Sequence, residues 1–245
     1  MFKNAIVRKP SKSLVGGIAS ENLGKLIYEK AIMQHEVYVE ALKKCGVEVT
    51  ILEADENYPD SCFVEDTAMV AKKCAIITNP GAQTRKGEEA IIKETLKKFY
   101  DNIECIKTPG TIEGGDVMMV GDHFYVGLST RTNEEGARQF IEILRKYGYG
   151  GTMVPLKKVL HLKTGLAYLE NNNLLVAAYS GVSGRQFRRH PDTLSIQFLL
   201  TLFLITNYHL VHIKLKDLKK FDLKALLFFP IKLLYTHSDC SATPF

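Results

Sequence analysis

The sequence has few cysteines and no pattern that would link them. Its 245 residues include five cysteines, and no two of them form a CxxC pair. This usage argues against a disulfide framework and against a zinc ribbon. The first residues, Met1-Phe-Lys-Asn, also lack the long apolar run of a secretory signal. We therefore expect a cytoplasmic protein, kept in a reducing compartment.

Net charge is absent from the larger part of the chain. Residues 1–180 contain 23 basic and 23 acidic residues, so the formal charge of +5 comes from residues 181–245, with 9 basic and 4 acidic residues. The charge is thus a property of the tail, and we expect no nucleic-acid partner. The 46% hydrophobic and 24% charged content is that of a soluble globular protein.

Glycine and glutamate are both missing after Gly184. This change of composition divides the chain into residues 1–180 and residues 181–245. Residues 194–213 carry no charge and are long enough to cross a membrane. Because Ser, Gln, Thr, Asn and His residues dilute this run, a membrane span is not the favoured interpretation. A tail read from a shifted reading frame is an alternative that fits the abrupt change.

Alternating and helical apolar patterns recur along the chain at a period of about 50 residues. Each unit reads as strand, strand, helix and strand. The expected strands are 4–8, 47–52, 67–71, 75–78, 103–106, 116–120, 124–128, 152–156, 166–169 and 174–178. The expected helices are 20–44, which Ser20 would cap, 87–100 and 133–147.

Units of this size cannot bury their own apolar faces, so they must stack side by side or around an axis. Five units would use nearly all of the 245 residues. We therefore predict an α/β fold, a ring of ββαβ units with a pocket at its axis. Residues 181–245 do not continue the pattern, so the last one or two units are not recognisable.

Polar residues precede the first strand of successive units. Asp66 and Asp116 are 50 residues apart, and Thr164 follows Asp116 by 48. This spacing predicts that the units direct their chemistry to one place. The acidic group is Asp60, Glu65, Asp66, Glu113 and Asp116.

Carboxylates in a water-poor pocket suit a planar guanidinium, which has five N–H donors. Arg85 and Arg131 each precede an expected helix and suit an α-carboxylate. Together these residues favour a pocket for an arginine-like amino acid. Each residue alone is also explained as a solvated loop charge or a local cap.

His161 stands where the other units have acidic residues. A histidine oriented by a carboxylate serves as a general acid and base near neutral pH, and Glu113 is the candidate for orienting it. A satisfied structural histidine is the alternative. No HxxxH, HxH or paired-Asp spacing supports a metal site, so no metal is expected.

The nucleophile is harder to find from the residues alone. Cys45, Cys74 and Cys105 lie in helix or strand runs, where cysteine usually serves as a small packed residue. Cys62, beside Phe63, is expected to line the pocket. Nothing in its local sequence proves that Cys240, near the end of the chain, is reactive.

Five motifs match a known family. Over about residues 1–178, the sequence resembles bacterial dimethylarginine dimethylaminohydrolases, which belong to the guanidino-group-modifying (pentein) superfamily. The motifs are Asp60-Ser-Cys-Phe-Val-Glu-Asp66, Gly81-Ala-Gln-Thr-Arg85, Pro109-Gly-Thr-Ile-Glu-Gly-Gly-Asp116, Ser129-Thr-Arg-Thr-Asn133 and Leu160-His-Leu-Lys-Thr-Gly-Leu166.

This resemblance implies a five-bladed α/β propeller that hydrolyses Nω-methylated arginine, such as asymmetric dimethylarginine, to citrulline without a cofactor. A Cys thiolate, assigned to Cys240, would attack the guanidinium carbon, and His161, oriented by Glu113, would move the protons. The implied substrate-binding residues are Glu65 and Asp66 for the guanidinium, Asp60 for the α-amino group, Arg85 and Arg131 for the α-carboxylate, Phe63 for the side chain, and Ile18 in the lid loop. The partner is then a small molecule, and a homodimer is one assembly the sequence leaves open.

The tail departs from the family pattern. His237-Ser-Asp239 precedes Cys240 where the family has a glycine-led turn with two glycines. The alternative to an active amidine hydrolase is a catalytically dead, truncated or frame-shifted relative that at most binds arginine-like ligands. A membrane-associated protein using residues 194–224 is a third hypothesis.

Overall fold

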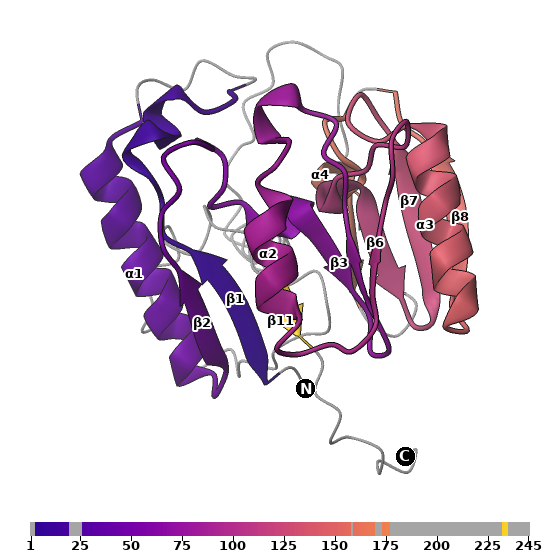
Figure 1. The fold of residues 1–245 in the computed structure, drawn as a ribbon, viewed down its shortest axis with the longest axis horizontal. Coiled ribbons are helices and arrows are strands. Elements are labelled where there is room, and N and C mark those ends of the chain that lie inside the picture. The colour runs from indigo at the N-terminus through magenta and orange to yellow at the C-terminus, as the bar shows by residue number, and fades with distance from the viewer. Residues whose placement is uncertain (1–2, 20–25, 158, 170–172, 177–231, 235–245) are drawn as a thin grey trace, which may run out of the picture.

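A computed structural model describes residues 3–19, 26–157, 159–169, 173–176 and 232–234 (Figure 1). The strands are β1 Asn4–Arg8, β2 Glu48–Leu52, β3 Ala68–Val70, β4 Ala75–Ile77, β5 Ile103–Cys105, β6 Val117–Val120, β7 His123–Leu128, β8 Gly150–Pro155, β9 Leu166–Leu169, β10 Asn173–Val176 and β11 Lys232–Leu234. The α-helices are α1 Tyr28–Lys44, α2 Glu89–Leu96, α3 Glu134–Lys146 and α4 Leu162–Gly165. The 3₁₀ turns are η1 Lys12–Gly16, η2 Val64–Thr67, η3 Gln83–Arg85 and η4 Gly114–Asp116.

Two units have the same three-stranded sheet, with strand orders β3-β4-β5 and β6-β7-β8. In each unit the first two strands pair antiparallel, and a helix then leads to a third strand that is parallel to the second. β9 and β10 form a further antiparallel pair. The predicted succession of strand, strand, helix and strand is therefore confirmed in these two units.

The first unit takes a strand from the far end of the chain. β1 is parallel to β2 across α1, and β11 pairs antiparallel with β1, with Asn4 opposite Leu234 and Ile6 opposite Lys232. Figure 1 shows β11 beside β1 in the middle of the molecule. β11 thus occupies in this unit the position that β3 and β6 occupy in theirs.

The units share their apolar cores, as expected for repeats that cannot bury their own faces. Ile6 of β1 packs in the cluster formed around β3, β4 and α2, and Met69 of β3 packs in the cluster around β6, β7 and α3. Phe124 and Phe140 meet edge to face in the latter cluster, with ring centroids 5.8 Å apart. Figure 1 shows α1 and α3 at opposite edges, with the sheets between them.

The predicted start of the first helix is wrong. The helix begins at Tyr28, and Ile27 before it is extended, with φ −106° and ψ 111°. Leu26 and Ile27, which fall within the predicted helix, are 40% and 60% exposed. Ser20, the predicted cap, lies outside the described residues. The third helix agrees with its predicted range of 133–147. The Asn133 side chain caps this helix by accepting the Gly136 N–H at 2.8 Å.

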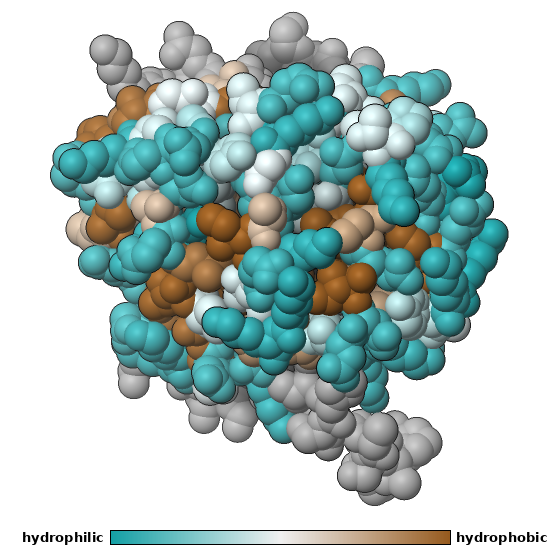
Figure 2. Space-filling model, in the orientation of Figure 1, coloured by the Kyte–Doolittle hydropathy of each residue, from teal (hydrophilic) through white to brown (hydrophobic). Residues whose placement is uncertain are grey.

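Hydrophilic side chains cover most of the face seen in Figure 2. Figure 2 shows apolar patches separated by hydrophilic side chains on the face seen in Figure 1. Met33 and Val37 of α1 and Ile91 of α2 are among the exposed apolar residues, and exposed apolar side chains are common on protein surfaces. Within the described residues, no helix is long and apolar enough to cross a membrane. The uncharged run 194–213 lies outside them.

Glycine allows a close backbone approach between units. A Cβ at buried Gly114 would overlap the carbonyl oxygen of Glu65, in the preceding unit. We expect Gly114→Ala to lower the free energy of unfolding by at least about 2 kcal/mol, because the obstructing atom is backbone and cannot move aside. Urea denaturation measures this loss.

Gly16→Ala is the matched control, since a Cβ there meets nothing within 4 Å. It should change the free energy of unfolding by less than about 0.5 kcal/mol. Equal stability of the two variants would contradict a tight backbone contact between the units.

Candidate active site

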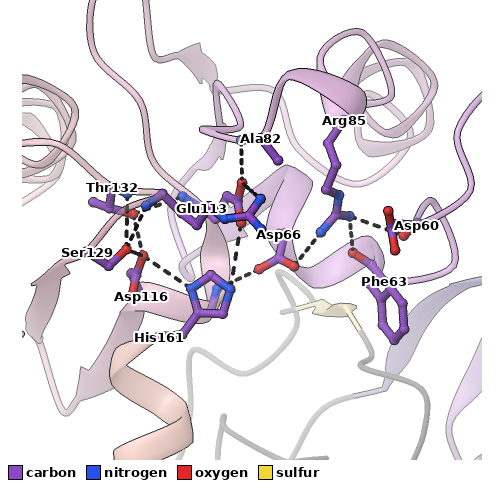
Figure 3. Close-up of polar contacts among 12 residues, drawn as sticks. Asp60, Phe63, Asp66, Ala82, Arg85, Glu113, Asp116, Ser129, Thr132 and His161 are labelled. Carbon is purple, nitrogen blue, oxygen red and sulfur yellow. Dashed lines mark hydrogen bonds and ion pairs between the residues drawn. The ribbon is translucent and has the colours of Figure 1, made fainter. Parts of the chain in front are cut away.

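Three short turns, each at the start of a unit, meet at one place (Figure 3). η2 precedes β3, η4 precedes β6, and α4 precedes β9. The Asp66 carboxylate accepts the Gly115 N–H at 2.8 Å, and the Asp116 carboxylate accepts the Leu162 N–H at 3.0 Å. Each turn is therefore hydrogen-bonded to the next by a carboxylate. The prediction that the 50-residue period directs polar residues to one place is confirmed for Asp66 and Asp116, whereas Thr164 is exposed and bonds the backbone of His161.

The imidazole of His161 lies between carboxylates from η4 and the residue before it. Nδ1 is 3.3 Å from Oδ2 of Asp116, and Nε2 is 3.7 Å from Oε2 of Glu113. The side chain of His161 is 13% exposed. A Cβ at Gly115 would come within 2.8 Å of the ring, so glycine at that position leaves room for the histidine. Both ring nitrogens thus face acidic groups.

Asp116 has no exposed surface and holds three segments together. Its Oδ2 accepts hydrogen bonds from the hydroxyls of Ser129 and Thr132, both at 2.6 Å, while Oδ1 binds Leu162. The sequence placed Asp116 in the acidic group but gave it no separate role. Its position directly after two glycines at the start of a strand was the signal that could have identified it.

The pKa of His161 is raised above its ordinary value of 6.5. Burial alone would lower it, but Asp116, Asp66 and Glu113 together outweigh that effect. Burial and the charge of Asp66 raise the pKa of Glu113. Burial also acts to raise the pKa of Asp66, but Arg85 and His161 bring it below its ordinary value. The site therefore favours an imidazolium beside an ionised Asp66.

Arg85 is 5% exposed, and the protein itself supplies acceptors for its guanidinium. Nη1 donates to Asp66 at 2.6 Å, Nε donates to Glu88 at 2.8 Å, and Nη2 also donates to Glu88. Nη2 further donates to the carbonyl oxygens of Asp60 and Phe63. Its predicted contact with an α-carboxylate stays a prediction, and no sequence pattern identified Glu88 as its partner.

Glu65 has a buried partner that the sequence did not predict. Lys163, on the α4 turn, forms an ion pair with it, and the two side chains are 3% and 15% exposed. The pair joins η2 to the turn that carries His161. Only the nearness of Lys163 to His161 in the sequence could have suggested this role.

The remaining predicted residues lie around this cluster. Ile18 is 48% exposed and donates its N–H to both carboxylate oxygens of Asp60, at 3.1 and 3.2 Å. Nη1 of Arg131 is 3.7 Å from Oε1 of Glu113. Phe63 is partly buried against the core of the first unit. Cys240 lies outside the described residues, so its place relative to His161 stays a prediction.

Three of these side chains could hold a metal ion. One ligand atom each from Asp66, Glu113 and His161 lies within 4.8 Å of the others. Asp66 is already bonded to Arg85 and Gly115, and Glu113 accepts the Ala82 N–H at 3.0 Å. The absence of a metal remains the expectation from the sequence.

Comparisons with known proteins agree with this geometry. The family model for eukaryotic N,N dimethylarginine dimethylhydrolase matches residues 19–182. The N(G),N(G)-dimethylarginine dimethylaminohydrolase of Pseudomonas aeruginosa is 58% identical over 178 residues, which are 72% of this chain and 70% of that protein. Its counterpart in Streptomyces coelicolor is 36% identical over 174 residues, or 71% and 67% of the two chains.

Solved structures give the same result. A mutant of the Pseudomonas aeruginosa enzyme in complex with citrulline has a TM-score of 0.71 and 58% identity, covering 73% of this chain and 71% of that one. The N-terminal domain of ArgZ, a cyanobacterial arginine dihydrolase, has a TM-score of 0.63 at 18% identity, over 71% and 66% of the chains, and shows similarity of fold alone.

The mixed α/β units and the histidine among carboxylates define a protein of the pentein type. Within that class, the chain belongs to the dimethylarginine dimethylaminohydrolase family.

The Lys163–Glu65 pair gives a prediction about stability. Lys163→Met should lower the free energy of unfolding by about 2 kcal/mol or more, because it leaves a largely buried carboxylate without its cation. Lys97→Met is the matched control, since Lys97 pairs with Glu94 on the surface, with side chains 54% and 67% exposed. The control should cost less than about 1 kcal/mol. Equal losses in urea denaturation would show that the Glu65 pair contributes no more than a surface pair.

The raised pKa of His161 gives a prediction about pH. Because the folded state stabilises the imidazolium, this contribution is complete below pH 6.5 and is lost as pH rises through the raised pKa. The difference in free energy of unfolding between the wild type and His161→Gln should therefore shift against the wild type as pH rises. Urea denaturation from roughly pH 6 to pH 9 measures it. A shift in the opposite direction would contradict a raised pKa.

Proposed function

We propose that the protein hydrolyses asymmetric dimethylarginine to citrulline and dimethylamine. The observation that carries this proposal is the position of His161 between Glu113 and Asp116 and beside Asp66. A buried group of carboxylates suits a cationic guanidinium, and an imidazolium beside it can donate a proton to a departing amine. The relatives named for the same hydrolysis support the assignment.

In this proposal Glu65 and Asp66 hold the guanidinium, and Asp60 holds the α-amino group. Arg131 serves the α-carboxylate, since it is 19% exposed and 3.7 Å from Glu113. Arg85 is the second residue proposed for the α-carboxylate. In the structure its guanidinium is hydrogen-bonded to Glu88 and Asp66. The two other proposed contacts are Phe63 against the substrate side chain and Ile18 in the loop over the pocket.

The reaction proceeds in two steps. A cysteine thiolate forms a bond to the guanidinium carbon, the bond from that carbon to the dimethylamine nitrogen breaks, and His161 gives its proton to the departing amine. Water then loses a proton to His161 and attacks the same carbon. The carbon–sulfur bond breaks, the new hydroxyl on the carbon loses its proton to solvent, citrulline leaves, and the thiolate returns. No cofactor is needed, because His161 supplies and recovers the only proton that must be stored.

Cys240 is the proposed nucleophile. Burial raises the pKa of both Cys62 and Cys74 to about 12, and it also raises the pKa of Cys45, so none of these thiols favours the thiolate. The β11–β1 pairing supports a ring that closes through residues 232–234, in agreement with a five-bladed propeller. A homodimer stays a prediction.

A relative that binds arginine-like ligands without hydrolysing them is the second candidate. In the described units the acidic pocket residues and His161 precede β3, β6 or β9, whereas Cys240 follows β11 by six residues. The family model also ends at residue 182. Both observations favour testing Cys240 directly.

Incubation of the protein with asymmetric dimethylarginine should release citrulline, which a colorimetric assay detects. His161→Gly should lower kcat by about 10²- to 10⁴-fold, the usual contribution of a general acid and base. Cys240→Ser should abolish the activity, because its hydroxyl is a far weaker nucleophile.

Cys105→Ser is the matched cysteine control and should keep the wild-type rate, since Cys105 lies on β5 outside the site. Binding of dimethylarginine without citrulline release by the folded wild type would favour the non-hydrolysing relative. Full activity of Cys240→Ser would refute its role as nucleophile.

A further inference from the structure

Glu88 is a buried acid to which the proposed reaction gives no part. It stands immediately before α2, where it occupies the N-cap position, and is 2% exposed. Its Oε1 accepts two N–H groups of Arg85, while Oε2 makes no hydrogen bond within the described residues. Its side chain makes no capping hydrogen bond to α2. Because a carboxylate is costly to bury, this placement needs another reason.

The two bonds to Glu88 fix the orientation of the Arg85 guanidinium. That group is planar, so holding Nε and Nη2 on one side also sets the direction of Nη1. Nη1 donates to Asp66 at 2.6 Å, and Nη2 reaches the carbonyl oxygen of Phe63 at 3.0 Å. Glu88 thereby determines how Arg85 holds both η2 and the turn before it.

Charged groups from three segments surround Glu88. Arg8 of β1 is 3% exposed, and its charge interacts with that of Glu88. Asp60 and Asp66, from the segment around η2, also interact electrostatically with Glu88. Burial raises the pKa of Glu88 to about 7; Arg85 opposes this rise, and Asp66 and Asp60 add to it. The Arg85–Glu88 pair is thus part of the electrostatic environment of the proposed guanidinium site.

We propose that Glu88 is a positioning residue for substrate binding: by holding the plane of the Arg85 guanidinium, it keeps Asp66 and the 60–63 turn in the geometry that receives the substrate. Glu88 does not touch the substrate and takes no part in proton transfer. Its loss therefore weakens binding more than it slows the chemical step. This inference rests on the proposed function, because it assumes that Asp66 binds the guanidinium.

Glu88→Gln and Glu88→Ala separate the two ways in which Glu88 can act. Glutamine keeps an acceptor for Arg85 and the shape of the side chain but removes the charge, whereas alanine removes both. We expect KM for asymmetric dimethylarginine to rise about tenfold in Glu88→Ala and less in Glu88→Gln, with kcat within about threefold of the wild type. Calorimetric titration with asymmetric dimethylarginine should show the same order of binding losses.

Glu94→Gln is the matched control, because Glu94 is on the exposed side of the same helix and 67% exposed. It should keep the wild-type KM. Circular dichroism and thermal unfolding establish that each variant is folded, and Glu88→Gln serves if Glu88→Ala does not fold.

Two results would overturn the inference while the proposed function stands. One is a folded Glu88→Ala or Glu88→Gln variant with the wild-type KM and affinity. The other is a fall in kcat with KM unchanged, which would place Glu88 in the chemical step. A folded wild type that neither binds asymmetric dimethylarginine nor releases citrulline would instead refute the proposed function, and the inference with it.

Discussion

The structure depends on one repeated interaction, a carboxylate at the start of one unit that accepts a backbone N–H from the next. Asp66 binds Gly115 in this way, and Asp116 binds Leu162. Both acceptors are charged, and such hydrogen bonds are stronger than neutral ones. Because the same contact recurs, the turns before β3, β6 and β9 face one another, and the side chains they carry share one site. The fold and the site therefore have the same cause.

Burying so many carboxylates is costly unless each has a cation or an N–H donor. Arg85 forms an ion pair with Asp66, and Lys163 forms one with Glu65. The Ser129 and Thr132 hydroxyls donate hydrogen bonds to Asp116. His161 can gain or lose a proton near neutral pH, which lets it act as an acid and a base within this network. A cationic substrate would add a further compensating charge. Stability and substrate binding are thus linked by the same electrostatic balance.

The sequence predicted the order of strands and helices in two units, and the meeting of Asp66, Glu113 and His161, because both follow from a period visible in the chain. It could not predict that Lys163 pairs with Glu65 or that Arg85 binds the carbonyl of Phe63, since these contacts depend on how units pack. The first helix was predicted to start too early, because apolar Leu26 and Ile27 suit a helix that buries one face, but in the structure they lie exposed. Pairing of β1 with β11 joins opposite ends of the chain and leaves no local pattern.

The central claim is that surrounding carboxylates hold His161 as an imidazolium ready to donate a proton. An NMR titration of the His161 ring, assigned by its loss in His161→Gln, measures this directly. The account predicts a midpoint above the ordinary value of 6.5, because Asp116, Asp66 and Glu113 outweigh the effect of burial. A midpoint at or below 6.5 would show that burial dominates and would contradict the account.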